Sequence, residues 1–313
     1  MQYEKDLVSV VIPTYRRSKM LTRAIDSVLG QTYSNVECIV VNDNEVGDEH
    51  SQVLYETLKV YNDNPRFRFL EQEKHINGAA ARNVGIRAAK GEYIAFLDDD
   101  DYWEEEKLQL QVDWLKSHDE SWGAVSCLSR RYKNEVMVRT GMPYNGGSVL
   151  LAVLCRRIGL GTGSVLIRRE ALDAAGYFDE SLMRHQDLQL FAFLAAKYKI
   201  GIVKKYLYNI ENRDTSNRPN IERLKEIKKA YFVAVEPAMK NLTQRQRRYV
   251  HIMHDFECAF AYLRNGYKAE GLKMAFSVCR YPATLYMAME RSFKRICGKV
   301  FRNYLNTKYS VRK

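Results

Sequence analysis

Short apolar runs alternate with segments of helical periodicity over the first 220 residues of this 313-residue chain. The first run, 8–12, is closed by Pro13, which is typical of a buried parallel strand. The segment after it places its apolar residues on one helical face and ends at Gly30, and Ser18 can cap its start. In all, the pattern predicts strands at 8–12, 36–41, 67–70 and 92–97, and helices at 18–30, 48–61 and 78–89.

Repeated strand-helix-strand units predict an α/β fold, a Rossmann-like and mostly parallel sheet flanked by helices, with right-handed crossovers. In such open sheets, ligands bind outside the carboxyl ends of the strands. We therefore expect functional side chains at the strand ends, at Thr14, Asp43 and the aspartates that follow residue 97.

Four consecutive aspartates, residues 98–101, follow the apolar run that ends at Leu97. Carboxylate oxygens are the ligands that Mg²⁺ and Mn²⁺ prefer, and Mg²⁺ is usually bound together with substrate phosphates. The alternative is a solvated acidic helix start, because Glu104, Glu105 and Glu106 come next and acids favour a helix N-terminus. The cluster alone leaves both interpretations open.

The basic charge of the chain belongs to its C-terminal third. Residues 221–313 carry 20 Lys and Arg against 7 Asp and Glu, a balance of +13, and since the whole chain has +11, residues 1–220 have −2. Helical periodicity continues at 221–239, 244–263 and 268–279. We expect an enzyme-like domain at 1–215 and a basic helical region at 216–313.

The segment 281–302 mixes aromatic and aliphatic residues with Lys and Arg, which favours a helix lying on an anionic membrane surface. Helices packed on the body with a solvated basic face are the alternative. The chain starts without a basic region followed by an apolar one, and its six scattered cysteines form no close pair. These features predict a cytoplasmic protein, possible association with the inner face of the cytoplasmic membrane, and no zinc site.

Several segments, in this order, resemble the successive motifs of family 2 glycosyltransferases with the GT-A fold. They are VSVVIPTYRR (8–17), QTYSNVECIVVND (31–43), GAAARNVGI (78–86) with GEYIAFLDDDD (91–101), and GYFDESL with HQDL (176–188). The likeness covers about residues 7–215. It implies a nucleotide-sugar donor, expected to be a UDP-sugar, a Mn²⁺ or Mg²⁺ cofactor, and inversion at the anomeric carbon.

The resemblance also implies donor-site residues. They are Pro13, Thr14, Tyr15, Asp43, Arg82, Asp98 and Asp99, with Asp98 and Asp100 as metal ligands. In the family, the residue at Asp43 accepts from the uracil ring N–H, and Asp99 resembles a ribose-contacting position. With four aspartates the register is open by one residue, and we expect Asp101 to be solvated rather than to support the metal site. For Arg82 the alternative to a nucleotide contact is a surface side chain, solvated or paired with Glu71 or Glu73.

Asp187 is the candidate catalytic base, because a carboxylate at a helix start and cleft edge can accept the proton of an acceptor hydroxyl. The alternative, which is compatible with this role, is an N-cap aspartate. Gln186 stands where the family often has an acid, and we expect His185 to be acceptor-side or structural. Residues 141–161 are expected to form part of the acceptor wall, and 206–218 either a closing loop or a linker.

The sequence thus predicts a single-sugar transferase that acts on a saccharide or lipid-linked acceptor, in bacterial surface polysaccharide or lipopolysaccharide synthesis. A nucleotidyltransferase is the alternative enzyme, although no Gly-rich phosphate loop follows the first strand. Nucleic-acid binding by the basic region is the alternative of another class, and it is not expected because the body is not basic.

Overall fold

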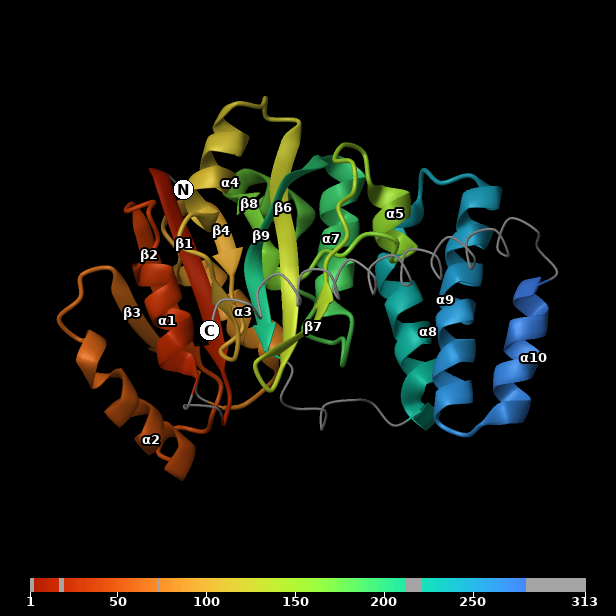
Figure 1. Cartoon of the computed structure of the whole chain (residues 1–313), viewed down its shortest axis with the longest axis horizontal. Coiled ribbons are helices and arrows are strands. Elements are labelled where there is room, and N and C mark those ends of the chain that lie inside the picture. The colour runs from red at the N-terminus through yellow and green to blue at the C-terminus, as the bar shows by residue number, and fades with distance from the viewer. Residues whose placement is uncertain (1–2, 17–19, 73, 212–220, 280–313) are drawn as a thin grey trace, which may run out of the picture.

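A nine-stranded sheet forms the centre of the protein (Figure 1). The computed structural model describes residues 3–16, 20–72, 74–211 and 221–279, with the backbone alone for 277–279. The strands described are β1 (Glu4–Thr14), β2 (Val36–Asn42), β3 (Phe67–Glu71), β4 (Gly91–Phe96), β5 (Tyr102–Trp103), β6 (Trp122–Lys133), β7 (Val136–Thr140), β8 (Val165–Arg168) and β9 (Lys199–Glu211). Their order in the sheet is β3-β2-β1-β4-β8-β6-β9-β5, with β7 paired to β6.

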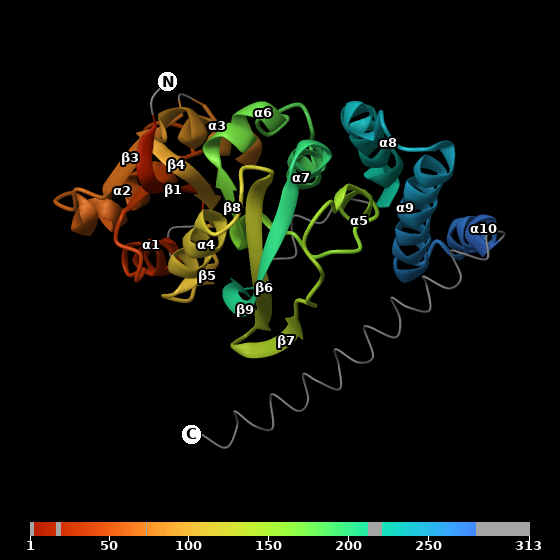
Figure 2. The ribbon, with the colours of Figure 1, turned by 90° about the horizontal axis from the view of Figure 1, so that it is seen from above.

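Helices cover both faces of the sheet, as Figure 2 shows. The helices described are α1 (Leu21–Leu29), α2 (Glu49–Leu58), α3 (Gly78–Ala88), α4 (Lys107–Lys116), α5 (Leu150–Leu154), α6 (Arg169–Ala175), α7 (Gln186–Lys197), α8 (Leu224–Val235), α9 (Gln244–Arg264) and α10 (Lys268–Cys279). Short 3-10 turns lie at Lys59–Tyr61, Thr162–Ser164, Ile221–Arg223 and Pro237–Met239. The α/β architecture expected from the sequence is confirmed.

The strands β3, β2, β1 and β4 form a parallel half-sheet that carries the predicted site residues at one edge. In this half Thr14 lies opposite Asn42, and Val11 lies opposite Phe96. Successive side chains of β1 point to opposite faces, so Val10 packs with α1, α2 and α4 while Val11 packs with α3 and α7. Burial on both faces explains why this strand is continuously apolar.

The other half of the sheet is mixed, so the prediction of a mostly parallel sheet holds only for the first half. β8 is antiparallel to both β4 and β6, β7 is antiparallel to β6, and β5 is antiparallel to β9, while β6 and β9 are parallel. A buried apolar run looks the same in either direction. Strand direction depends on where the chain re-enters the sheet, which the local pattern does not specify.

The helices α8 and α9 pack onto the same core as the sheet. Tyr231 and Val235 of α8 and Val250 and Met253 of α9 are buried in one apolar cluster with residues of β1, α3 and α7. α10 packs on α9, where Gly271 allows close approach to Leu263. None of the described helices combines the length and apolar content needed to cross a membrane.

The helices expected from the C-terminal periodicity are confirmed by α8, α9 and α10. The segment expected to lie on a membrane, 281–302, falls outside the described residues, as does the proposed cap Ser18. The expectation of a loop or linker at 206–218 is wrong for its first part, since Tyr206 to Glu211 belongs to β9, and 212–218 lies outside the described residues. Pairing with β6 along its length draws these residues into the sheet.

Candidate active site

The ends of β1, β2 and β4 bring Thr14, Asp43 and the aspartate run together at one edge of the sheet. The hydroxyl of Thr14 donates to Asp99 Oδ2 at 2.8 Å, and the amide of Asp43 donates to the carbonyl of Thr14 at 2.9 Å. Pro13 lies one residue back in β1, opposite Val41 of β2. The parallel register therefore joins residues that are up to 85 positions apart in the sequence.

The aspartate run forms a turn whose side chains alternate in exposure. The amide of Asp101 donates to the carbonyl of Asp98 at 3.1 Å, which closes the turn. The side chain of Asp98 is 38% exposed and Asp100 is partly exposed, whereas Asp99 and Asp101 are buried. Asp98 and Asp100 are thus the two more exposed residues of the run.

Asp101 is not solvated, contrary to expectation. Its carboxylate accepts hydrogen bonds from the hydroxyl of Tyr208 and, at 2.9 Å, from the amide of Glu211, both in β9. Burial raises its pKa well above the ordinary range, and the neighbouring charges of Asp98 and Asp100 add to this. The sequence contains no local signal for these partners, because β9 lies more than 100 residues away.

Arg82 faces the aspartate run from the second turn of α3. One guanidinium nitrogen lies 2.5 Å from Asp98 Oδ1, and another donates to the carbonyl of Gly78 at 3.2 Å. Arg82 is thus paired with Asp98 rather than with Glu71, whose carboxylate accepts from Tyr55, and Glu73 lies outside the described residues. Asn77 caps α3 by accepting from the amides of Ala79 and Ala80, which fixes where the helix begins.

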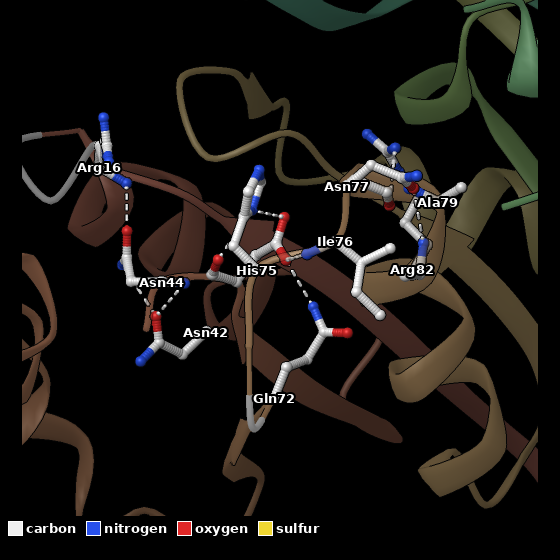
Figure 3. A network of polar contacts seen from close by, with 12 residues as sticks. Arg16, Asn42, Asn44, Gln72, His75, Ile76, Asn77, Ala79 and Arg82 are labelled. Carbon is white, nitrogen blue, oxygen red and sulfur yellow. Dashed lines mark hydrogen bonds and ion pairs between the residues drawn. The ribbon is translucent and has the colours of Figure 1, made fainter. Parts of the chain in front are cut away.

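Asp43 is buried at the end of β2 inside a polar network (Figure 3). Its Oδ1 accepts from Gln72 Nε2 at 2.7 Å and from the amide of Ile76 at 3.3 Å, and its Oδ2 lies 3.1 Å from His75 Nδ1. Burial raises the pKa of this carboxyl, and His75 opposes the shift. Gln72 and His75 were missed by sequence reasoning because a loop gives no periodic pattern.

Tyr15 borders the same network. Its ring stacks on that of His75, with 4.0 Å between centroids and 15° between planes, and the Arg16 guanidinium lies 4.9 Å from the tyrosine centroid. Arg16 also donates its amide to Asn44, whose own side chain and amide bond to Asn42. A small pocket beside this loop is lined by Thr14, Arg16, Asn44, Glu49, His50, Val53 and Leu54.

Asp187 lies in the first turn of α7, half-buried, on a different element from the aspartates. The N-cap of α7 is His185, at φ 67°, so Asp187 is not the N-cap. Burial raises the pKa of Asp187; Arg156 and Arg82 lower it and Asp98 raises it further. The candidate base is therefore a half-buried carboxyl whose pKa lies above that of an ordinary aspartate.

A polar cluster joins the helical region to Arg156, which follows α5. Glu257 of α9 lies 2.6 Å from Arg156 and 3.5 Å from Lys228, and the Lys228 ammonium donates to His254 Nδ1 at 2.8 Å. Tyr231 packs edge-on against His185, with 5.5 Å between the ring centroids. Residues beyond 215 therefore adjoin the site, which no local motif had indicated.

The profile of "Glycosyl transferase family 2" matches residues 9–175 of this sequence. The chain belongs to this family. Among curated relatives of this family 2 glycosyltransferase, an uncharacterized glycosyltransferase of Rickettsia felis is 30% identical over 207 residues, which is 65% of this chain and 32% of that protein. The Escherichia coli protein named UDP-Glc:alpha-D-GlcNAc-diphosphoundecaprenol beta-1,3-glucosyltransferase WfgD is 25% identical over 72% of this chain and 85% of its own length.

Solved structures agree with the family. S. aureus TarS 1-349 in complex with UDP-GlcNAc has a TM-score of 0.62 and 21% identity, covering 87% of this chain and 73% of that one. The GT-A fold of this family 2 glycosyltransferase is thereby confirmed. The chain spans only 15 to 32% of the length of the first three Rickettsia relatives, which are considerably longer proteins.

The side chains of this family 2 glycosyltransferase that could coordinate a metal fit a divalent cation only if the substrate supplies further ligands. Within the described part of the chain, no three His, Cys, Asp or Glu side chains converge as a metal-binding group. Mg²⁺ commonly binds through one or two carboxylates, with waters and substrate phosphates as its other ligands. The partly exposed carboxylates of Asp98 and Asp100 supply that number, so the residues fit a cation shared with a diphosphate.

Proposed function

We propose that this protein is an inverting glycosyltransferase that moves a single sugar from a UDP-sugar to an acceptor hydroxyl. The observation that carries the proposal is the meeting of side chains at the carboxyl ends of β1 and β4, where Thr14 donates to Asp99 at 2.8 Å and Arg82 lies 2.5 Å from Asp98. Asp187, a half-buried carboxyl in the first turn of α7, is the proposed base for an in-line displacement. Single transfer, the donor nucleotide and inversion are parts of this proposal.

In this proposal the nucleotide lies along the ends of β1 and β2. Pro13, Thr14 and Tyr15 line its base, and Asp43 accepts from the base N–H. Arg82 binds a phosphate oxygen, for which its forked guanidinium is well suited. Asp99, whose carboxylate accepts from the hydroxyl of Thr14, contacts the ribose, and Asp98 lies on the diphosphate side.

Asp187 accepts the proton of the acceptor hydroxyl as its oxygen forms a bond to the anomeric carbon. The bond from that carbon to the diphosphate breaks with its electrons on the leaving UDP, so the configuration inverts. Burial favours this role, because a raised pKa makes a carboxylate a better proton acceptor. The proton leaves the site later from Asp187.

We assign Asp98 and Asp100 as ligands of a Mn²⁺ or Mg²⁺ ion. When bound, such an ion stabilises the negative charge that develops on the departing diphosphate. The ion pair with Arg82 holds Asp98 in place and limits the repulsion between neighbouring carboxylates.

The acceptor is proposed to be a saccharide or a lipid-linked saccharide of bacterial surface polysaccharide or lipopolysaccharide synthesis. The name of the relative WfgD, a glucosyltransferase acting on a diphosphoundecaprenol-linked sugar, supports this class. We assign residues 1–215 to the GT-A domain and 216–313 to a basic helical region. Because Tyr231 of α8 packs against His185, which precedes α7, we propose that this region completes the acceptor side.

We further propose that the protein works in the cytoplasm, at the inner face of the membrane. The exposed surface of α9 and α10 combines large apolar with basic side chains, which suits an anionic lipid surface. These exposed residues are Phe260, Leu263, Arg264, Tyr267, Lys268, Leu272, Lys273 and Phe276.

A screen of nucleotide sugars with and without Mn²⁺ tests the proposed function. We expect one UDP-sugar to raise the melting temperature and to be hydrolysed slowly without acceptor, because ligand binding to the native state stabilises it. Asp187→Asn is the matched control, since it should keep the thermal shift and lose turnover. If none of the nucleotide sugars raises the melting temperature, with or without metal, the proposal is contradicted.

A further inference from the structure

His75 makes both of the contacts that a flat nucleotide base would need at the end of β2. Its imidazole stacks on Tyr15 at 4.0 Å and 15°, and its Nδ1 lies 3.1 Å from Asp43 Oδ2. Figure 3 shows the ring of His75 from close by. A pyrimidine with a ring N–H would use an aromatic face and a carboxylate in the same way. The imidazole of His75 therefore occupies the position that a planar base with a ring N–H would take.

A ligand cannot reach the Asp43 carboxylate by another route, because its other oxygen is bonded within the protein. Asp43 is 2% exposed, and its Oδ1 is bonded by Gln72 and by the amide of Ile76. His75 Nδ1 additionally lies 3.0 Å from the carbonyl oxygen of Asp43, which keeps the ring over this residue. A base can reach Oδ2 only after His75 has moved.

We propose that His75 occupies the base subsite of the unliganded enzyme and is displaced when the nucleotide binds. The inference rests on the proposed function, because it takes the end of β2 as the base subsite. His75 competes with the base for this subsite. It lowers the affinity for the nucleotide in proportion to the fraction of molecules in which His75 occupies the subsite. The same side chain, on returning, favours release of the nucleotide product.

The exposure of the two partners shows which of them can move. The side chain of His75 is 37% exposed at the rim, whereas that of Asp43 is 3% exposed and fixed by Gln72 from β3's end. Rotation of His75 toward solvent breaks the stacking contact with Tyr15 and both contacts of Nδ1, to the Oδ2 and to the carbonyl oxygen of Asp43, and leaves Asp43 and Tyr15 in position. A ligand that lacks a base, such as pyrophosphate, makes no contact that would displace His75.

Calorimetric titrations of the full chain with UDP and with inorganic pyrophosphate, both in the presence of Mn²⁺, test this inference. For His75→Ala we expect about 10-fold tighter binding of UDP, since a hydrogen bond to a charged group must otherwise be broken. We expect no change for pyrophosphate. His75→Phe, which can stack on Tyr15 but cannot donate to Asp43, should lie between wild type and His75→Ala, and Tyr15→Ala should weaken UDP alone.

Unchanged or weaker UDP binding by folded His75→Ala would overturn the inference, the latter because it would make His75 a contact of the base. These outcomes differ from failure of the proposed function, in which neither wild type nor any variant binds UDP or another nucleoside diphosphate. That result would overturn both. Histidine ring resonances that move toward solvent-exposed values on addition of UDP, and are absent in His75→Ala, provide an independent supporting readout.

Discussion

The hydroxyl of Tyr208 in β9 donates a hydrogen bond to the buried carboxylate of Asp101, and so ties the aspartate turn to the far half of the sheet. Both side chains are 3% exposed. The metal-side carboxylates Asp98 and Asp100 belong to the same turn, so their positions depend on a contact made outside the run.

Tyr208→Phe should lower the free energy of unfolding by about 1–3 kcal/mol, because it leaves a buried carboxyl with one donor fewer. We also expect weaker binding of UDP with Mn²⁺, since the turn loosens. Urea denaturation and calorimetry measure the two effects. Tyr206→Phe in the same strand is the matched control, as its hydroxyl makes only a 3.4 Å bond to Gly141. Equal stability losses in the two variants would refute a special role for the Tyr208 contact.

Asp187→Asn should reduce transfer by at least about 100-fold, the range found when a general base is removed. Affinity for UDP should change little, because Asp187 acts on the acceptor. Initial rates and calorimetry separate these effects. Glu170→Gln, an exposed acid in the first turn of α6, is the control and should keep normal turnover. Normal turnover of Asp187→Asn would remove it as the base.

The pH profile of the wild type offers a second measurement of the same residue. Because burial raises the pKa of Asp187 and only the deprotonated form accepts a proton, turnover should fall on the acid side at a pH above that of an ordinary aspartate.

Asp100→Ala should abolish the Mn²⁺ dependence of UDP binding, because one of the two proposed metal ligands is lost. Calorimetric titrations with UDP, with and without Mn²⁺, measure this. Glu105→Ala removes an exposed acid just after the run and is expected to behave as wild type. If Asp100→Ala retains metal-dependent binding while Asp98→Ala loses it, the register of the metal ligands is shifted.

His254 should make the fold sensitive to acid. Burial, with a contribution from the Lys228 charge, lowers its pKa to about 3 from 6.5. As the pH falls from 6.5 toward 3, the unfolded chain takes up a proton that the native state does not, so stability present above pH 6.5 is progressively lost. The loss is at most about 1.4 kcal/mol per pH unit for this group.

His254→Gln should reduce this slope in urea denaturation at pH 7, 6 and 5, measured against the wild type. It should also be less stable at pH 7, because His254 accepts from Lys228 and donates to the carbonyl of Leu154. An unaltered slope in the variant would show that acid sensitivity arises elsewhere, for example at His185, whose pKa burial also lowers to about 3.

The sequence by itself determined the first four strands, the helices between them, the helices of the C-terminal region and the acidic edge of the sheet. Apolar runs such as 8–12 specify buried strands locally, and polar residues directly after them, such as Asp43, must emerge at strand ends. The order of the motifs was enough to identify the family, which the profile match over 9–175 confirmed.

The tertiary structure alone decided strand direction and the environment of each charged residue. Asp101 is buried because Tyr208 and Glu211 approach it from β9, and Asp43 is enclosed because His75 folds over it from a loop. The burial and hydrogen bonding of a residue depend on neighbours that are distant along the chain, whereas sequence periodicity reflects only residues that are close along it. For the same reason, the sequence did not indicate that α8 adjoins the site. Tyr231 of α8 is buried in the apolar core that the sheet and the helices share.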